Sequence, residues 1–228
     1  TYDMLMSVNL PPSVGTTSMN VNFGQLNNKG LDLSLSAQII RNKDWFWSMT
    51  LTGGHVMDQI RKISQGLKND IDNPYDSSKP KILFVEGGSQ YDIYAMRSAG
   101  IDPATGKEIF IKKNGEYTFK YDENERVAVG NTNPILQGSW MNTVRYKGFS
   151  ISLATSYTFG SDYYNSTLKN KVENIDLDYN VDRRVFTDRW KQPGDHTRFL
   201  GIGTSSSSSQ YSERFVEKRN ELYISSIQ

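Results

Sequence analysis

The sequence of 228 residues contains no cysteine and only two histidines, His55 and His196. Without cysteine the chain can form neither a disulfide scaffold nor a thiolate zinc cluster, and it offers no thiol nucleophile. Two histidines far apart in the sequence give no indication of a histidine-rich metal site. We therefore expect no metal, no cofactor and no catalysis of bond-making or bond-breaking by this chain.

The sequence also lacks an excess of charge of either sign, because 26 Lys and Arg residues stand against 25 Asp and Glu residues, a net charge of +1. No global field therefore attracts nucleic acid or anionic lipid. No apolar run approaches the roughly 20 residues that a membrane-spanning helix needs. These two absences exclude a nucleic-acid partner and a helical membrane protein.

Alternation of apolar and polar residues, the period of a half-buried strand, is what the sequence does contain. Residues 31–39 place Leu, Ala and Ile on one face and polar groups on the other, and residues 45–53 repeat the pattern. A short polar turn at 41–44 joins the two segments. They predict a long β-hairpin.

The same pattern recurs towards both ends of the chain. Residues 136–146 and 149–160 predict a second hairpin that turns at Lys147-Gly148, and single strands are expected from Tyr2 to Val8 and from Phe215 to about Ile227. We therefore expect about six long strands in an all-β antiparallel fold. The connections alternate between long and short, and the long ones are expected at 10–28, 56–133 and 161–212.

Two physical settings produce this pattern. A strand with lipid on one side and a polar lumen on the other alternates in this way, and roughly 9 to 11 residues cross a bilayer. Transmembrane barrels also have short periplasmic turns, long outer loops and aromatic girdles, and Trp45, Trp47, Tyr146 and Phe149 lie beside the short turns. A soluble antiparallel sheet with one face on a core gives the same alternation. The pattern alone does not choose between them.

Several short segments occur in a recognisable order and spacing. They are Asn22-Phe23-Gly24 with Asn28-Lys29-Gly30-Leu31-Asp32-Leu33, then residues 99–106 (AGIDPATG), Tyr146-Lys147-Gly148-Phe149, and residues 189–195 (RWKQPGD). Each segment is short, but as an ordered set they resemble the C-terminal half of the barrel of SusC/RagA-type TonB-dependent outer-membrane transporters.

The resemblance implies a large barrel in the bacterial outer membrane that imports nutrients such as oligosaccharides or peptides with energy delivered through TonB. It also implies a SusD-like surface lipoprotein as a lid. Residues 1–228 would then be part of the barrel domain, with the plug domain, the signal peptide and the closing strands absent. Such a part alone is not expected to close, so it would keep two open sheet edges.

The alternation then assigns two faces to the strands. Polar residues such as Asp32, Ser34, Ser36, Gln38, Ser150, Ser152 and Ser156 would line the lumen. The residues expected to face lipid are Leu31, Leu33, Leu35, Trp47, Leu51, Ile151, Leu153 and Tyr157.

The long connections hold the candidate contacts for cargo or lid. These are Tyr91, Tyr94, Asp102, Tyr117 and Trp190. Aromatic rings can stack on sugars or anchor a partner at little entropic cost. The competing interpretation is that the rings form small cores inside the loops and that Asp102 serves a turn. Within one loop, Asn114-Gly115 predicts a small hairpin with a type I′ turn.

Two alternatives remain open from sequence alone. A soluble carbohydrate-binding or adhesion module is the main one, and a secreted hydrolase would need converging acid and base groups. Residues 176–180 (DLDYN) are similar to the start of a calcium loop, but Val181 stands where that loop needs glycine. Asp195 and His196 precede a serine run at 205–209, yet no glycine-flanked nucleophile is present.

Overall fold

The computed structural model describes residues 4–9, 18–63, 84–175, 178, 180–203 and 210–228. Its main feature is a six-stranded antiparallel sheet with the order β1-β2-β3-β9-β10-β11. The strands are β1 (Met4–Asn9), β2 (Ser18–Arg41), β3 (Trp45–Ile63), β9 (Leu136–Tyr146), β10 (Phe149–Tyr164) and β11 (Val216–Ile227). The six long strands and the all-β antiparallel class expected from the sequence are confirmed. Tyr2, placed at the start of the first strand, lies outside the described residues.

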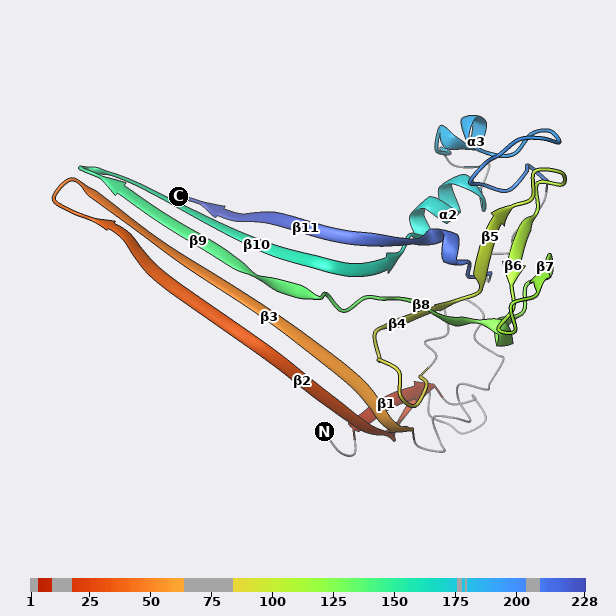
Figure 1. The fold of residues 1–228 in the computed structure, drawn as a ribbon, viewed down its shortest axis with the longest axis horizontal. Coiled ribbons are helices and arrows are strands. Elements are labelled where there is room, and N and C mark those ends of the chain that lie inside the picture. Colours follow the sequence, from red (N-terminus) through yellow and green to blue (C-terminus); the bar gives the residue numbers. More distant parts are fainter. Residues whose placement is uncertain (1–3, 10–17, 64–83, 176–177, 179, 204–209) are drawn as a thin grey trace.

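The sheet is one elongated layer, with both short turns at one end and the remaining elements at the other (Figure 1). We call those remaining elements the loop cap. They are β4 (Asp92–Ala95), β5 (Arg97–Ile101), β6 (Glu108–Ile111), β7 (Tyr117–Thr118), η2 (Glu123–Glu125), β8 (Val127–Asn131), α2 (Ser166–Val172), α3 (Arg184–Thr187) and η3 (Glu213–Phe215). Among the described residues, no helix has the length and apolarity needed to cross a bilayer.

The alternation of the sequence becomes two faces because antiparallel partners point to the same side. Leu35 pairs with Leu51, which pairs with Trp140, and these residues share what we call the apolar face. Ser36 pairs with Thr50 on the opposite, polar face. Leu31, at 74% exposure, shows that no described element covers the apolar face there.

The two short turns are built by local hydrogen bonds. The carboxamide Oδ1 of Asn42 accepts from the backbone N–H groups of Asp44 (3.1 Å) and Trp45 (2.7 Å). Lys147 has φ of 52°, the only positive φ of a non-glycine residue in the described part of the chain. Both turns lie where the sequence placed them, so the hairpin pairs β2–β3 and β9–β10 are set by adjacent segments.

Three details differ from the sequence-based expectation. Strand β2 already begins at Ser18, so most of the long connection expected at 10–28 is strand, extended by pairing with β1. A register shift between Gln38 and Ile40 brings Ile40 opposite Trp47. Gly115 alone has positive φ (89°) in the small hairpin, which therefore has a three-residue loop instead of a type I′ turn.

The sheet does not close. Strand β1 pairs only with residues 18–24 of β2, and in the described part of the chain nothing pairs with the rest of that edge or with the outer edge of β11. The sheet therefore has two long edges of backbone groups that need partners in a membrane. This open arc agrees with the expected part of a barrel.

The largest cluster of buried hydrophobic side chains lies in the loop cap, and the sheet itself buries Leu26, Ile60 and Ile63. Leu168 and Val172 of α2 pack with Phe199 and Phe215, and Tyr164 covers the cluster. Most of the loop cap is therefore ordered like a small globular domain, although it is made of connections between strands.

Candidate transport surface and loop cap

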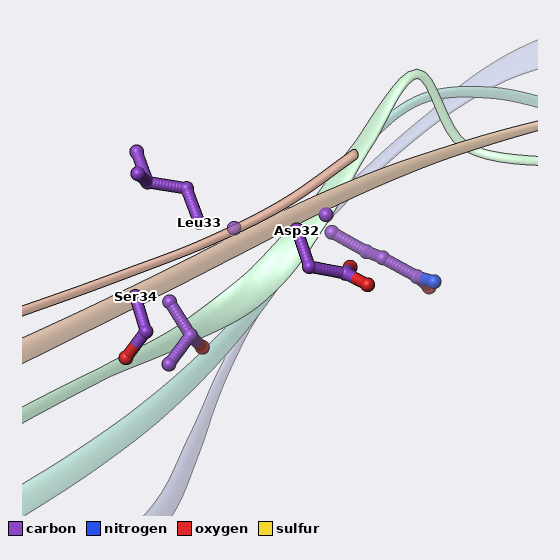
Figure 2. Close-up of a pocket in the computed structure, with 7 residues that line it drawn as sticks. Asp32, Leu33 and Ser34 are labelled. Atoms are coloured by element: carbon purple, nitrogen blue, oxygen red, sulfur yellow. The ribbon is translucent and has the colours of Figure 1, made fainter. Parts of the chain in front are cut away.

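The polar face of the sheet carries a shallow hollow of about 400 Å³. Asp32 and Ser34 point into it, whereas Leu33 points to the opposite side of the ribbon (Figure 2). Gly54 makes room for the carboxylate, because a Cβ there would lie 2.6 Å from Asp32 Oδ1. Thr52, Gly53 and Gln137 complete the lining. The hollow is an open, polar patch of wall and not an enclosed pocket.

Short hydroxyl side chains make up most of the polar face beyond this hollow. Ser36 Oγ lies 3.1 Å from Thr50 Oγ1, and Thr52 Oγ1 lies 2.8 Å from Ser139 Oγ. Further pairs join Thr143 to Ser152 (3.2 Å) and Ser156 to Ser225 (3.1 Å). These pairs cross from strand to strand, so the face offers many neutral hydrogen-bonding groups to a polar solute.

Three successive rows of this face contain no charge. They are Ser34-Thr52-Ser139-Ser156, Ser36-Thr50-Met141-Ala154 and Gln38-Ser48-Thr143-Ser152. The next row towards the loop cap contains Asp32, and the next row towards the short turns contains Arg41 and Arg145. Charge on the polar face is thus confined to its two ends.

The residues expected to face lipid all lie on the apolar face, by their strand register. They are Leu31, Leu33, Leu35, Trp47, Leu51, Ile151, Leu153 and Tyr157. Polar residues also share this face, among them His55, Asn142 and Thr155. The Oδ1 of Asn142 accepts a hydrogen bond from Trp47 Nε1 (3.3 Å). The placement is as expected, and contact with lipid stays a prediction.

Tyr157 lies across two glycines on the apolar face. Its hydroxyl donates to the carbonyl of Thr52 (2.6 Å), two strands away. A Cβ at Gly138 would lie 2.7 Å from that hydroxyl, and one at Gly53 3.3 Å. The ring fills the space that the missing side chains leave, which is a known way to stabilise glycine in a sheet.

The loop cap is held by a buried ion-pair network. Arg214 donates to Glu108 (2.7 Å) and Glu173 (2.9 Å), and these three side chains are at most 8% exposed. Burial alone would lower the pKa of Arg214, but hydrogen bonds and charge from Glu108 and Glu173 raise it above its usual value. Ser212 also hydrogen-bonds Glu108, and the backbone N–H of Leu200 donates to Glu173. The network joins β6, α2 and η3.

Lys169 of α2 is buried beside this network. Its ammonium donates to the carbonyl of Gln210 and lies 5.3 Å from the ring centroid of Tyr211. Burial lowers the pKa of Lys169 to about 8, although the carboxylates of Glu173 and Glu108 oppose this shift. The amine therefore titrates closer to neutral pH than an ordinary lysine.

Two of the motifs that carry the resemblance, segments 99–106 and 189–195, are in contact in the structure. Trp190 Nε1 donates to the carbonyl of Pro103 (2.8 Å), and a Cβ at Gly106 would lie 2.5 Å from the Trp190 ring. Gly194 N–H also donates to Pro103 (2.9 Å). Arg189, next to Trp190, is buried and donates to the carbonyls of Val172, Leu200 and Gly201.

The candidate cargo or lid contacts occupy different environments. Tyr117 is 71% exposed and Tyr91 43% exposed. Tyr94 is half-buried, and burial, with the charge of Asp92, raises its pKa. Asp102 accepts from the hydroxyl of Thr105 (2.6 Å) and from Ala104 N–H (3.1 Å), which lowers its pKa. Contact of these residues and of Trp190 with cargo or lid stays a prediction.

The catalytic and metal alternatives gain no support from the described residues. No group of three or more His, Asp or Glu side chains among them could hold a metal ion. Asp195 Oδ2 accepts from the backbone of Lys191 and Gln192 (3.0 Å each), as in a turn. Most of the segment similar to a calcium loop, and the serine run at 205–209, lie outside the described residues.

Sequence reasoning missed the ion-pair network. Arg214 and Glu108 are 106 positions apart, and Arg214 and Glu173 are 41 apart. Nothing local in the sequence distinguishes these residues from solvated surface charges. Arg189 could have been singled out, because it opens one of the motifs that carry the resemblance.

Comparisons with known proteins show which proteins this chain is similar to. No family model matches the chain. TonB-dependent receptor P39 of Formosa agariphila is 24% identical over 272 aligned residues, which cover all of this chain and 26% of that protein. TonB-dependent receptor P3 of the same organism is 25% identical over 187 residues, 74% of this chain and 18% of that protein.

Solved structures give the same result for the fold. The RagAB peptide transporter superposes with a TM-score of 0.78 at 24% identity, over 99% of this chain and 24% of that chain. The RagAB peptide importer in its open-open state gives 0.75 at 24% identity, with the same coverage. The 228 residues span about a quarter of the length of these relatives. The resemblance to SusC/RagA-type TonB-dependent outer-membrane transporters that the motifs indicated is thus confirmed, with the fold of an open part of such a barrel.

Proposed function

We propose that residues 1–228 form part of the β-barrel domain of a TonB-dependent outer-membrane transporter that imports nutrients such as oligosaccharides or peptides. The observation that carries the proposal is the two-faced single layer: large apolar side chains are exposed on one side and paired hydroxyls lie on the other. A barrel wall with lipid outside and a water-filled lumen inside needs one apolar face and one polar face. A soluble binding module would instead bury the apolar face.

The role of the chain in transport is binding and passage. The polar face would form part of the lumen wall, and the loop cap would stand on the extracellular side. The rest of the longer protein would supply the plug domain, the contact with TonB and the remaining strands. A SusD-like surface lipoprotein would cover the loop cap. The RagAB neighbours are peptide importers by name, which favours peptide over oligosaccharide as cargo.

Tyr117 is the best placed of the candidate contacts for cargo or lid. It is 71% exposed at the tip of the β6–β7 hairpin, whereas Trp190 is engaged with Gly106 and Pro103 inside the loop cap. We expect Tyr117→Ala to reduce binding of cargo or lipoprotein, while Trp190→Ala would first loosen the contact between segments 99–106 and 189–195. Uptake assays combined with co-purification of the lipoprotein separate these effects.

Cysteine labelling tests the facing of the sheet directly, because residues 1–228 contain no cysteine and the unsubstituted full-length protein gives the background labelling. Leu33→Cys and Ser34→Cys are adjacent and differ in face, so they form a matched pair. In the full-length protein in outer membranes, a water-soluble maleimide should label the Ser34→Cys variant and leave the Leu33→Cys variant largely unmodified. A bilayer-soluble spin quencher should give the opposite order.

Two results would contradict the proposal. Equal labelling at both positions would mean that the apolar face is in water. Recovery of the full-length protein in the soluble fraction, folded and without detergent, would favour the binding module instead.

A further inference from the structure

The last row of the polar face before the short turns is charged and aromatic, unlike the rows beside it. Arg41 of β2, Phe46 of β3 and Arg145 of β9 are successive cross-strand partners, so three neighbouring strands place their side chains in one line on that face. The guanidinium carbon of Arg145 lies 4.3 Å from the ring centroid of Phe46. We call these three residues the arginine row.

The arginine row differs from the wall next to it. The three following rows on the polar face are uncharged and consist mainly of Ser and Thr. Phe46 is the only aromatic residue that β2, β3, β9 and β10 contribute to the polar face between the Asp32 row and the short turns. An aromatic ring between two guanidinium groups is therefore a local feature and not a continuation of the hydroxyl surface.

The positive charge of the arginine row is not neutralised nearby. Neither Arg41 nor Arg145 forms an ion pair within the described residues, and both side chains are exposed. The two turns add Lys43, Lys147 and one carboxylate, Asp44, so four cationic groups and one acidic group give this end a charge of 4 − 1 = +3. Lys147 stacks on Tyr146, which belongs to the apolar face.

This arrangement suits a carboxylate ligand. A guanidinium group binds a carboxylate through two parallel hydrogen bonds. A guanidinium group held over an aromatic ring is already partly oriented and less hydrated, so it loses less freedom when it binds. Arg145, which is held over Phe46, and Arg41 on the same line can engage successive acidic side chains of an extended segment, with Phe46 as an apolar contact between them.

We propose that the arginine row is an interaction surface for an acidic segment of the same protein, from the part of the transporter that these residues do not span. The inference rests on the proposed function, since the polar face must line the lumen. The relatives are about four times longer than this chain, so the proposal places the acidic segment in the part of such a longer polypeptide that these residues do not span. Lipid phosphate is the other chemistry that guanidinium groups bind, but lipid would meet the apolar face.

Site-specific photo-cross-linking in the full-length transporter tests this inference. A benzophenone amino acid replaces Phe46, and the same amino acid replaces Phe149 as the matched control. Phe149 lies near the same turns on the apolar face and is 83% exposed. We expect position 46 to cross-link within the polypeptide to a segment rich in Asp or Glu, and position 149 to cross-link lipid only.

The contribution of the arginines is measured with the same probe. Arg41→Gln with Arg145→Gln should lower the cross-linking yield at position 46 by about tenfold, while Arg145→Lys should retain most of it. Arg145→Glu should abolish the cross-link, and replacing the cross-linked carboxylate by arginine should restore it. If the double variant does not reach the outer membrane, each single Gln variant gives the same comparison, with an expected loss of several-fold.

The outcomes separate the inference from the proposed function. A cross-link to lipid at position 46 together with one to polypeptide at position 149 would reverse the facing and overturn both. Lipid cross-links at position 149, with no polypeptide cross-link at position 46 or with a yield unchanged by the Gln variants, would overturn the inference alone.

Discussion

In the loop cap, Val172 and Phe215 are almost completely buried, whereas in the sheet Leu33 and Ile151 are more than half exposed. Charged side chains are also distributed differently in the two regions. The loop cap buries Arg214 between two carboxylates, while the central rows of the polar face contain no charge. The loop cap thus has apolar contacts inside, whereas the sheet exposes an apolar face and a polar face.

The fraction of hydrophobic residues in a sequence is a poor guide to whether its strands can form a membrane wall. Each strand of the sheet needs an apolar residue only at alternate positions, and the partner face supplies hydroxyls. The loop cap, although made of connections, packs like a soluble domain because its residues have only one solvent.

The largest expected effect is in the loop cap. Glu173→Ala removes one partner of Arg214 and the acceptor of Leu200 N–H, and breaking a buried pair in this way costs about 3–5 kcal/mol. Hydrogen exchange of α2 and residues 199–215 in the full-length protein measures the loss. Asp182→Asn, which removes the exposed pair with Arg184, is the matched control and should leave exchange unchanged. Equal exchange in the two variants would mean that the network does not hold the loop cap.

The next effect distinguishes the two faces of the sheet. Leu33→Arg near mid-membrane should lower the free energy of unfolding by about 2–4 kcal/mol, because the charge would enter lipid. Ser34→Arg should cost much less, since the side chain would enter the lumen. Urea unfolding of the full-length protein in vesicles measures both. Equal costs would contradict the assigned facing.

A smaller effect concerns Tyr157. Tyr157→Phe removes the hydrogen bond to the Thr52 carbonyl but keeps the ring over Gly53 and Gly138, so the sheet should lose about 1 kcal/mol. Tyr146→Phe, on the same face with its ring tilted against that of Trp45 (centroids 4.3 Å apart), is the control and should cost less. The same unfolding assay applies. A loss no greater than that of the control would mean that the hydroxyl does not stabilise the sheet.

The smallest effect is the pH dependence of the loop cap. The pKa of Lys169 is about 8 in the folded protein and near its ordinary value of 10.5 when unfolded. Between these values the unfolded chain binds the extra proton, so the stability of the loop cap should rise as pH increases from 8 towards 10.5. Below pH 8 the cost of the buried charge is fully present. Hydrogen exchange corrected for intrinsic rates measures the slope, and Lys169→Met should abolish it. A slope retained in that variant would assign it to another group.

The sheet could be predicted from sequence because its signal is local. Alternation at 31–39, 45–53 and 149–160 fixed both the strands and their faces, and Lys147-Gly148 and Asn42 marked the short turns. The early start of β2 could not be predicted, since residues 18–28 carry no clear alternation and become strand through pairing with β1 and with the far half of β3.

The loop cap could be predicted only in part. The β6–β7 hairpin was expected from Asn114-Gly115, but its turn type depends on backbone angles that the dipeptide alone does not determine. Glu108, Glu173 and Arg214 meet only after β6, α2 and η3 are placed, and no period in the sequence encodes such contacts. The contact of Trp190 with Gly106 could not be predicted either, because the two residues belong to two separate motifs in the sequence.

The three uncharged rows of the polar face have a kinetic consequence. A polar molecule moving along them exchanges one weak, neutral hydrogen bond for another of similar strength, so no position holds it much longer than the next. Asp32, the charge at the end of these rows nearest the loop cap, is the place where it would pause. Residence times along this wall would therefore be set at that end, and no position in the middle would retain the molecule.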